Sequence, residues 1–514
     1  MHSRFSKIID QIIEWGIIFL LFFTPLAFGA VHLWAYSLME LVICLLCMLW
    51  ILKLIAIRNE RTSSRITSAP TSHHTPSRVN RFGFVKTPLN IPVLVFVGLI
   101  FFQLIPLPPG VLKFLNPHTY SLYETTLTGW PEEAPFFESA DDTPEYQNTE
   151  ILPGESPQYK KQNPYSSWRT LSINPYATKT ELLKVLAYIG IFLLIINNPG
   201  LRITRIIIVA VGIGFFISFL GILQKLTGTT KIYWIRDASY ATPFGSYICR
   251  NHFAGYIGMV IPLTLGLLVA RFARITFSQK VTWRTFVETL ESHFLGNIIL
   301  IFALMIMISA LCLSLSRGGI ISFLTTVVIF FALISFKRTR AVIHKGRGVL
   351  LSVLLVTLIF LLWFGLSPVL DRMSDLSSSS RIVVYQDTIT MAKDFPFWGT
   401  GWGTFQYLYP KYKSLEDRYF YKYAHNDYLE LLSDNGLSGF LAVLSFIVIF
   451  FWKVLAKWWK RRDSYARGIT LGGVCSIVSI LFHSYGDFNL HIPANALFLS
   501  CVLGITYNAV TIKK

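Results

Sequence analysis

The chain has 514 residues, of which 53% are hydrophobic and 14% are charged, and its formal net charge is +18. Soluble domains usually carry about 25% charged residues, so this composition excludes an ordinary soluble protein and is typical of an integral membrane protein. The positive charge would suit a nucleic-acid partner, but it lies mainly in connections between apolar runs, where it indicates membrane topology instead. We therefore expect no nucleic-acid partner.

The apolar runs predict about twelve membrane-spanning helices, because one span needs about 20 mainly apolar residues. The first run has no clear small-residue cleavage site, so we interpret it as a span and not as a cleaved signal peptide. The predicted fold is thus an all-α polytopic membrane protein. The predicted spans are residues 13–34, 36–56, 89–107, 181–197, 204–226, 253–272, 297–315, 319–336, 348–367, 436–454, 468–486 and 494–511.

Basic residues cluster in four connections, each of which follows an even-numbered span. Two of them are "KRTRAVIHKGR" at 337–347 and "KVLAKWWKRRDSYAR" at 453–467. Because short loops rich in Lys and Arg stay on the cytoplasmic side, these connections and both termini are expected to be cytoplasmic. The remaining connections then lie on the opposite face of the membrane.

Two long connections on that opposite face divide the chain. The first contains an acidic, Pro-rich stretch with few aliphatic residues, which predicts irregular structure. The second has aromatic residues, Gly punctuation and helical periodicity, so we expect it to fold with short helices. The expected segments are 1–107 with spans 1–3 and a basic loop, 108–180 as the acidic loop, 181–367 with spans 4–9, 368–436 as the large folded loop, and 437–514 with spans 10–12.

Three arginines stand at the outer ends of predicted spans or loops. Arg250 precedes Asn251 and His252 in "CRNHFAGY", Arg317 lies in "SLSRGG", and Arg381 follows a serine run. Guanidinium groups bind phosphate oxygens bidentately, so together these residues would suit a diphosphate. The alternative for any single arginine is contact with lipid headgroups. Arg317 is the strongest candidate for a ligand contact, because the two glycines after it would let its backbone approach closely.

The stretch "KYAHNDYLELLSDNG" at 422–436 is polar, although apolar runs surround it. We expect His425 to begin a short helix, with Asp427 or Glu430 orienting its ring. Imidazole has a reference pKa of about 6.5, which suits proton abstraction near neutral pH. The alternative is a structural histidine at the helix start. The segment 434–436 predicts a helix end before the next span.

A second polar cluster lies in "HSYGDFNLHIPANA", where His483 and Asp487 are one helical turn apart and His491 follows. A metal site is conceivable, but no third ligand is apparent, so a structural hydrogen-bonded cluster is favoured. Five of the six cysteines lie in apolar runs, which argues against disulfides and zinc. With no phosphate-binding loop motif either, we expect neither a metal nor another cofactor.

The motifs "CRNHFAGY", "SLSRGG", "GTGWGTFQ", "AHNDYLELLSDNG" and "HSYGDFNLHIPANA" follow one another in this order. With them, about residues 200–510 of the chain resemble the O-antigen ligase and polymerase superfamily of bacterial inner membranes. The resemblance implies a GT-C-like helical fold with a large periplasmic loop. It also implies transfer of a glycan from undecaprenyl diphosphate to an acceptor at the periplasmic face, without metal or nucleotide. The acceptor would be a lipid-linked repeat unit or the lipid A core.

The resemblance implies that arginines engage the diphosphate and that a loop histidine activates the acceptor hydroxyl. Carried over to this chain, the catalytic residues are His425, Arg317 and Arg250. The expected substrate-binding residues are Arg381, Asn251, His252, Asn426, Asp427, Tyr428 and Glu430. Polymerase, ligase and protein O-oligosaccharyltransferase use the same donor chemistry, so the motifs leave all three open. A transporter of lipid-linked glycans or solutes is less favoured, because the spans carry few charges.

Overall fold

The computed structural model describes residues 2–67, 85, 87–131, 167–238, 241–272, 283–336 and 379–511. Within these residues, ten helices are long and apolar enough to cross a membrane. This confirms the predicted all-α polytopic fold. The predicted span 89–107 corresponds to a shorter apolar helix, Asn90–Gln103, and the predicted span 348–367 lies outside the described residues.

The elements follow one another with two short strands among the helices. In the first half they are α1 (His2–Leu26), η1 (Phe28–Ala30), α2 (Leu33–Thr67), α3 (Asn90–Gln103), α4 (Pro109–Leu115), α5 (Pro117–Thr126), α6 (Pro175–Asn197), α7 (Ile203–Thr227), β1 (Lys231–Ile232) and β2 (Arg236–Asp237). In the second half they are α8 (Arg250–Phe272), α9 (Trp283–Leu313), α10 (Arg317–Phe336), α13 (Ser379–Asp394), α14 (Phe405–Tyr412), α15 (Asp427–Lys460), α16 (Ser464–His483), η3 (Asn489–His491) and α17 (Pro493–Thr511).

Helix α8 is the centre of the bundle, since all of its residues from His252 to Ala270 are buried. Its closest neighbour is α16. A Cβ added to Gly266 of α8 would lie 2.5 Å from the carbonyl oxygen of Gly468 and 2.6 Å from the Cα of Gly472. Such backbone contact is possible only between glycines, and it is a common way to pack membrane helices.

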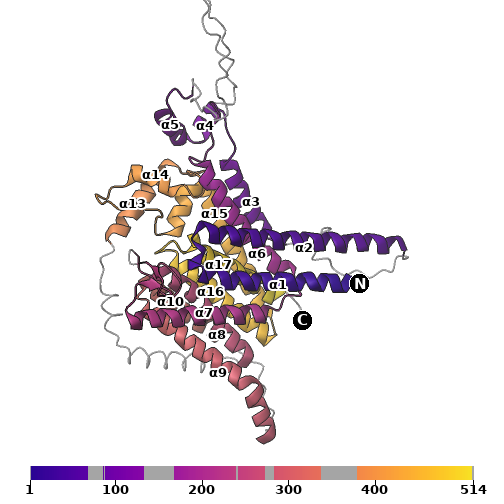
Figure 1. Cartoon of the computed structure of the whole chain (residues 1–514). Coiled ribbons are helices and arrows are strands. Elements are labelled where there is room, and N and C mark those ends of the chain that lie inside the picture. The colour runs from indigo at the N-terminus through magenta and orange to yellow at the C-terminus, as the bar shows by residue number, and fades with distance from the viewer. Residues whose placement is uncertain are drawn as a thin grey trace, which may run out of the picture.

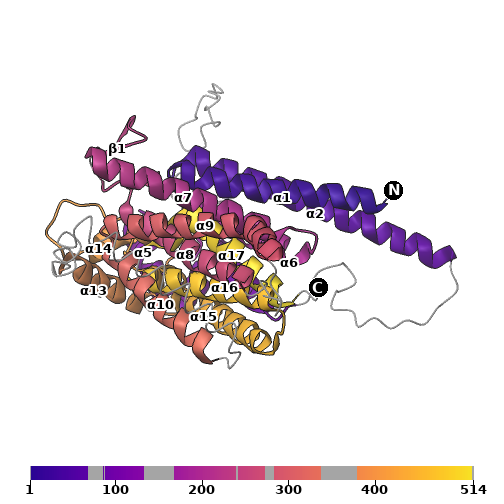
Figure 2. The same ribbon diagram turned by 90° about the horizontal axis from the view of Figure 1, so that it is seen from below.

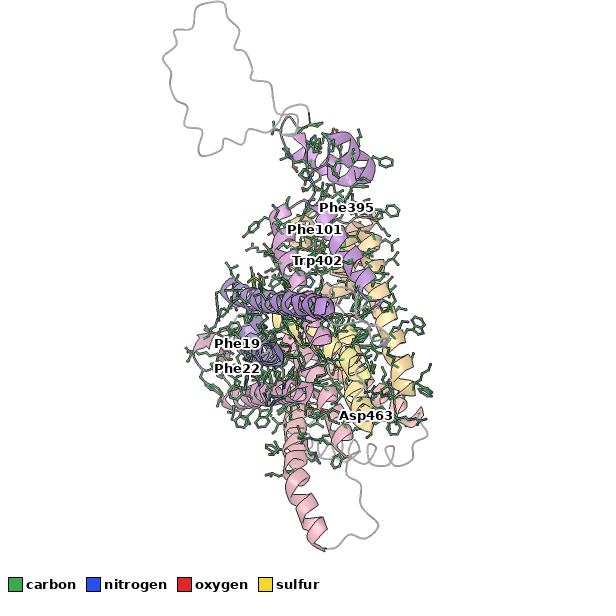
Figure 3. The ribbon with its side chains drawn as sticks, turned by 90° about the vertical axis from the view of Figure 1, so that its right-hand side faces the viewer. Phe19, Phe22, Phe101, Phe395, Trp402 and Asp463 are labelled. Atoms are coloured by element: carbon green, nitrogen blue, oxygen red, sulfur yellow. The ribbon has the colours of Figure 1, made fainter. Side chains whose placement is uncertain are left out.

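The two ends of the bundle differ. Figure 2 shows the N- and C-termini at one end and α13 and α14 at the other. The outward faces of the spans are apolar: Phe19 and Phe22 of α1, labelled in Figure 3, are 44% and 52% exposed. An apolar outer surface of this kind suits contact with lipid.

The end with α13 and α14 carries folded structure beyond the spans. Helices α13 and α14 pack together and against α15 (Figure 1), around a small apolar core that includes Val384, Met391 and Phe405. Within the connection 108–180, α4 and α5 pack around a second core with Leu112 and Trp130. Part of this connection is therefore ordered. Its acidic stretch at 132–158 lies outside the described residues.

Helix α15 kinks at Gly436, where φ is 61° and ψ is −169°, and then continues to Lys460. The helix end that we predicted at 434–436 is therefore only a kink. The helix continues because backbone groups of a neighbouring segment form the hydrogen bonds that are lost within the helix at this point. The amide of Leu437 donates to the carbonyl of Pro396 at 2.7 Å. A Cβ at Gly436 would lie 2.4 Å from the carbonyl of Phe397, so the position requires glycine.

The motif "GTGWGTFQ" forms a turn that is fixed to the same part of α15. The amides of Thr400 and Gly401 donate to the carbonyls of Ser433 and Asp434 at 3.1 and 2.9 Å. The side chain of Gln103, at the end of α3, donates to the Asp434 carbonyl at 2.9 Å. The turn thereby holds the first part of α15, which begins next to His425, in a defined position.

Candidate functional site

The site is centred on Asp487, in the loop 484–492 between α16 and α17. Asp487 is buried, and it accepts hydrogen bonds from the Asn251 side chain at 2.5 Å and from the Phe488 amide at 2.9 Å. Its carboxylate also lies 3.4 Å from Nδ1 of His425 and 3.9 Å from Nη2 of Arg381. Residues from α8, α13 and the segment before α15 therefore meet at one buried carboxylate.

Asp487 is charged at neutral pH. Burial on its own would raise the pKa of this carboxyl, but the nearby His425, His252 and Arg381 side chains outweigh it and hold the pKa well below its usual range. A buried carboxylate that stays ionised beside an imidazole fixes the direction of the ring.

His425 has a strained backbone, with φ at 54°. This left-handed conformation is uncommon for a residue other than glycine and often marks functional sites. The hydroxyl of Tyr385 donates to the His425 carbonyl at 2.8 Å, and the His425 ring lies 4.9 Å from the ring of Phe488. The side chain is 29% exposed, and its Nδ1 faces Asp487. Nε2 is thus the ring nitrogen that remains for a substrate.

Asp427 and Glu430, which we expected to orient His425, contact His491 instead. Their carboxylates lie 2.9 Å from Nδ1 and 3.1 Å from Nε2 of that ring. Burial lowers the pKa of His491, but the two carboxylates outweigh it and raise the pKa to about 9. His491 is therefore a buried imidazolium that ties the start of α15 to the loop 484–492.

Asn426 and Tyr428 have structural roles in the same junction. The Asn426 side chain caps α15 by accepting from the amides of Tyr428 and Leu429 at 3.0 and 3.2 Å. The Tyr428 hydroxyl donates to the Leu481 carbonyl at 2.6 Å. These two expected substrate-binding residues thus hold α15 against the end of α16 and the loop after it.

Arg381 and Arg250 stand on helices that contact the loop 484–492. Arg381 donates to the carbonyl of Gly486 at 2.7 Å, and its side chain is 39% exposed. Arg250 begins α8 and precedes Asn251, which binds Asp487.

Arg317 begins α10, and the glycines that follow it are used for helix packing. A Cβ at Gly318 would lie 2.8 Å from the ring of His483, and one at Gly319 would lie 2.6 Å from the Cβ of Ala254. The two glycines thus let α10 approach α16 and α8. Whether they also bring Arg317 close to a ligand stays a prediction. Arg317 is nevertheless brought next to the buried end of α16.

The cluster His483, Asp487 and His491, which the sequence treated as secondary, is part of the same site. His252 is also buried; its Nε2 lies 3.9 Å from Oδ1 of Asp487, and its ring lies 4.6 Å from the ring of Phe488. Over the described ranges, no group of three or more His, Cys, Asp or Glu side chains is arranged to hold a metal ion.

Sequence reasoning missed three contributors to this geometry. Asp487 was not recognised as the partner of His425, because 62 residues separate them. Tyr385 and Phe488, which fix the His425 backbone and ring, carry no local signal beyond their aromatic character. Only the position of Phe488, directly after Asp487, could have indicated that it lies near the site.

The fold and the site define a multi-pass membrane protein with a buried carboxylate, a histidine and arginines gathered at one end of its bundle. Residues 302–444 match the family model of the O-antigen ligases, and this region contains Arg317, Arg381 and His425. The match supports membership of the O-antigen ligase and polymerase superfamily, and with it glycan transfer in general. No curated protein matches the chain.

Proposed function

We propose that this protein transfers a glycan from an undecaprenyl-diphosphate carrier to a sugar hydroxyl of an acceptor, as a polymerase or ligase of surface polysaccharide. The observation that carries the proposal is the pairing of His425 with the buried carboxylate of Asp487 at 3.4 Å, beside Arg381. His425 and Arg381 lie inside the matched region. A base, an orienting carboxylate and a cation for the leaving group are the parts that this transfer needs.

In the proposed step, Nε2 of His425 takes the proton of the acceptor hydroxyl. The hydroxyl oxygen forms a bond with the anomeric carbon, while the bond from that carbon to the diphosphate oxygen breaks and its electron pair leaves with the lipid diphosphate. Asp487 stabilises the imidazolium that forms. Arg381, Arg317 and Arg250 stabilise the growing negative charge. A single displacement of this kind inverts the anomeric centre.

The basic ends of the spans support an orientation for this reaction. Arg271 lies in the last turn of α8, and Lys457 and Lys460 lie in the last turn of α15, whereas the site residues lie at or near the starts of the same helices. With basic residues on the cytoplasmic side, the site faces the periplasm of a bacterial inner membrane. Lipid-linked glycans of surface polysaccharides would meet the site there.

The test is deletion of the gene, followed by glycan gels and complementation. Loss of the ladder, with single repeats still attached to lipid A, identifies a polymerase. Loss of all glycan from lipid A identifies a ligase, and loss from proteins alone identifies a protein O-oligosaccharyltransferase. Unchanged surface glycans together with impaired uptake of a solute or lipid-linked glycan would refute the proposal in favour of a transporter.

A further inference from the structure

A cavity of about 470 Å³ adjoins the site, with His252, Phe488 and His491 in its wall. Small-molecule sites usually measure about 300–1,000 Å³, so this volume suits a short oligosaccharide. The cavity lies among the starts of α2, α6 and α8, the segment 403–407, and the residues around Tyr423 and His491. These segments belong to the same end of the bundle as Asp487.

We propose that this cavity is the subsite for the acceptor glycan, and that it holds the sugars next to the hydroxyl that is attacked. The inference rests on the proposed function. It adds a location and a set of residues for the acceptor, which the pairing of His425 and Asp487 does not supply.

The lining of the cavity combines aromatic rings with hydrogen-bonding groups, as sites for sugars do. Tyr36, Tyr176, Tyr407 and Tyr423 line the cavity. Such residues combine an aromatic ring, on which the C–H face of a sugar can pack, with a hydroxyl that can hydrogen-bond. The Tyr423 ring is itself held by stacking on Phe488, with centroids 4.4 Å apart.

Charged groups of both signs line the same cavity. Lys184 lies 2.5 Å from Glu181 and is placed over the ring of Tyr36 at 4.5 Å from its centroid. Lys422 and Glu430 add another donor and another acceptor. A balanced set of donors and acceptors fits the hydroxyls of a glycan, whereas a diphosphate would favour cations alone.

A second cavity provides a contrast. It measures about 180 Å³ and is lined almost entirely by apolar side chains, among them Pro92, Phe96 and Phe446. Such a lining suits a hydrocarbon chain. The polar lining of the larger cavity therefore distinguishes it from this second cavity.

The cavity and the catalytic pair share a wall. Phe488 lines the cavity and lies 4.9 Å from the His425 ring, and His252 lines it and lies 3.9 Å from Asp487. The arginines 250, 317 and 381 are not among the described residues that line the cavity. The acceptor sugars and the donor diphosphate would therefore occupy different places, so that the acceptor hydroxyl and the leaving diphosphate can lie on opposite sides of the anomeric carbon.

The substitution Thr180→Trp tests this subsite. Thr180 lines the cavity from α6, and its hydroxyl donates to the Tyr176 carbonyl at 3.1 Å. A tryptophan there occupies part of the cavity, and neither His425 nor Asp487 is among the described residues that line it. We expect the apparent KM for the acceptor to rise at least about tenfold, with the KM for the donor unchanged.

The assay uses purified full-length protein in nanodiscs. The donor is radiolabelled lipid-linked glycan extracted from the deletion strain, and membranes of that strain supply the acceptor in increasing amounts. The matched control is Thr390→Trp on α13, because Thr390 is exposed, makes the same hydrogen bond to a carbonyl four residues earlier, and does not line the cavity. We expect wild-type kinetics from this control.

Each outcome decides the inference. An unchanged acceptor KM in Thr180→Trp, or a rise in the donor KM alone, overturns it. If Thr180→Trp does not fold, Tyr36→Ala decides in its place, with the same increase in acceptor KM expected. If wild-type protein transfers no label, the proposed function fails and the subsite fails with it; if wild type is active and both variants behave like the control, only the subsite is refuted.

Discussion

Replacing Asp487 with asparagine keeps the size of the side chain and removes the charge that faces His425. At 3.4 Å and an effective dielectric constant of about 20, the carboxylate stabilises an imidazolium by about 5 kcal/mol. Because the imidazole is 29% exposed, solvent screens roughly half of this, leaving about 2–3 kcal/mol. We therefore expect Asp487→Asn to lower kcat by about 30- to 150-fold.

The kinetic constants show whether Asp487 acts on the catalytic step or on substrate binding. A residue that orients the base acts in the transition state, so kcat should fall while the KM values for donor and acceptor stay within about twofold. The assay is the nanodisc transfer assay, with thermal unfolding measured in parallel. Glu416→Gln, the same change at an exposed carboxylate, is the control. Wild-type kcat in a folded Asp487→Asn protein would refute the assignment of Asp487 as the positioning residue.

Four other variants or conditions test the remaining parts of the site. His425→Ala should abolish transfer, while the variant still inserts in the membrane and unfolds at the wild-type temperature. Turnover of this variant at the wild-type rate would show that His425 is not the base. Arg317→Lys should lose most activity, because an ammonium cannot replace a bidentate guanidinium, and full activity would reduce Arg317 to a packing role. Transfer should persist in a metal chelator, since the proposed step takes its positive charge from arginines; loss that added Mg²⁺ restores would contradict this. The pKa of His491 is raised to about 9 in the folded chain, so its stabilisation is complete below the unfolded value of about 6.5 and is lost as pH rises through about 9. Thermal stability should fall over that range and should fall less in His491→Gln; identical pH profiles would contradict the ion cluster.

Much of the fold is predictable because a membrane span is a local property of the chain. About 20 apolar residues satisfy their own backbone in a helix, so composition alone locates α7 or α9. Helix ends depend on finer details. The predicted span 181–197 begins six residues too late, because Asn174 caps α6 and Pro175 occupies its first turn.

The partners within the site were less predictable, because they come from distant segments. Asp427 and Glu430 were the natural orienters of His425 by proximity in sequence, yet both bind His491. Whether a carboxylate at 427 or at 487 faces the ring depends on how the loop 484–492 folds against α15. That packing leaves no periodic signal in the sequence, whereas the arginines and His425 could be identified by residue type and position.

The contact between α8 and α16 has a mechanical consequence. Asn251 lies 15 residues from Gly266, about 22 Å along α8 at 1.5 Å per residue, and Asp487 follows the end of α16. The backbones of α8 and α16 touch at Gly266, Gly468 and Gly472, so the two helices should move as one rigid unit. If one helix shifted along the other at this contact, Asn251 would move away from Asp487. A methyl group added at Gly472, deep in the bilayer, should therefore displace Asn251 from Asp487 and disturb the site at the membrane surface.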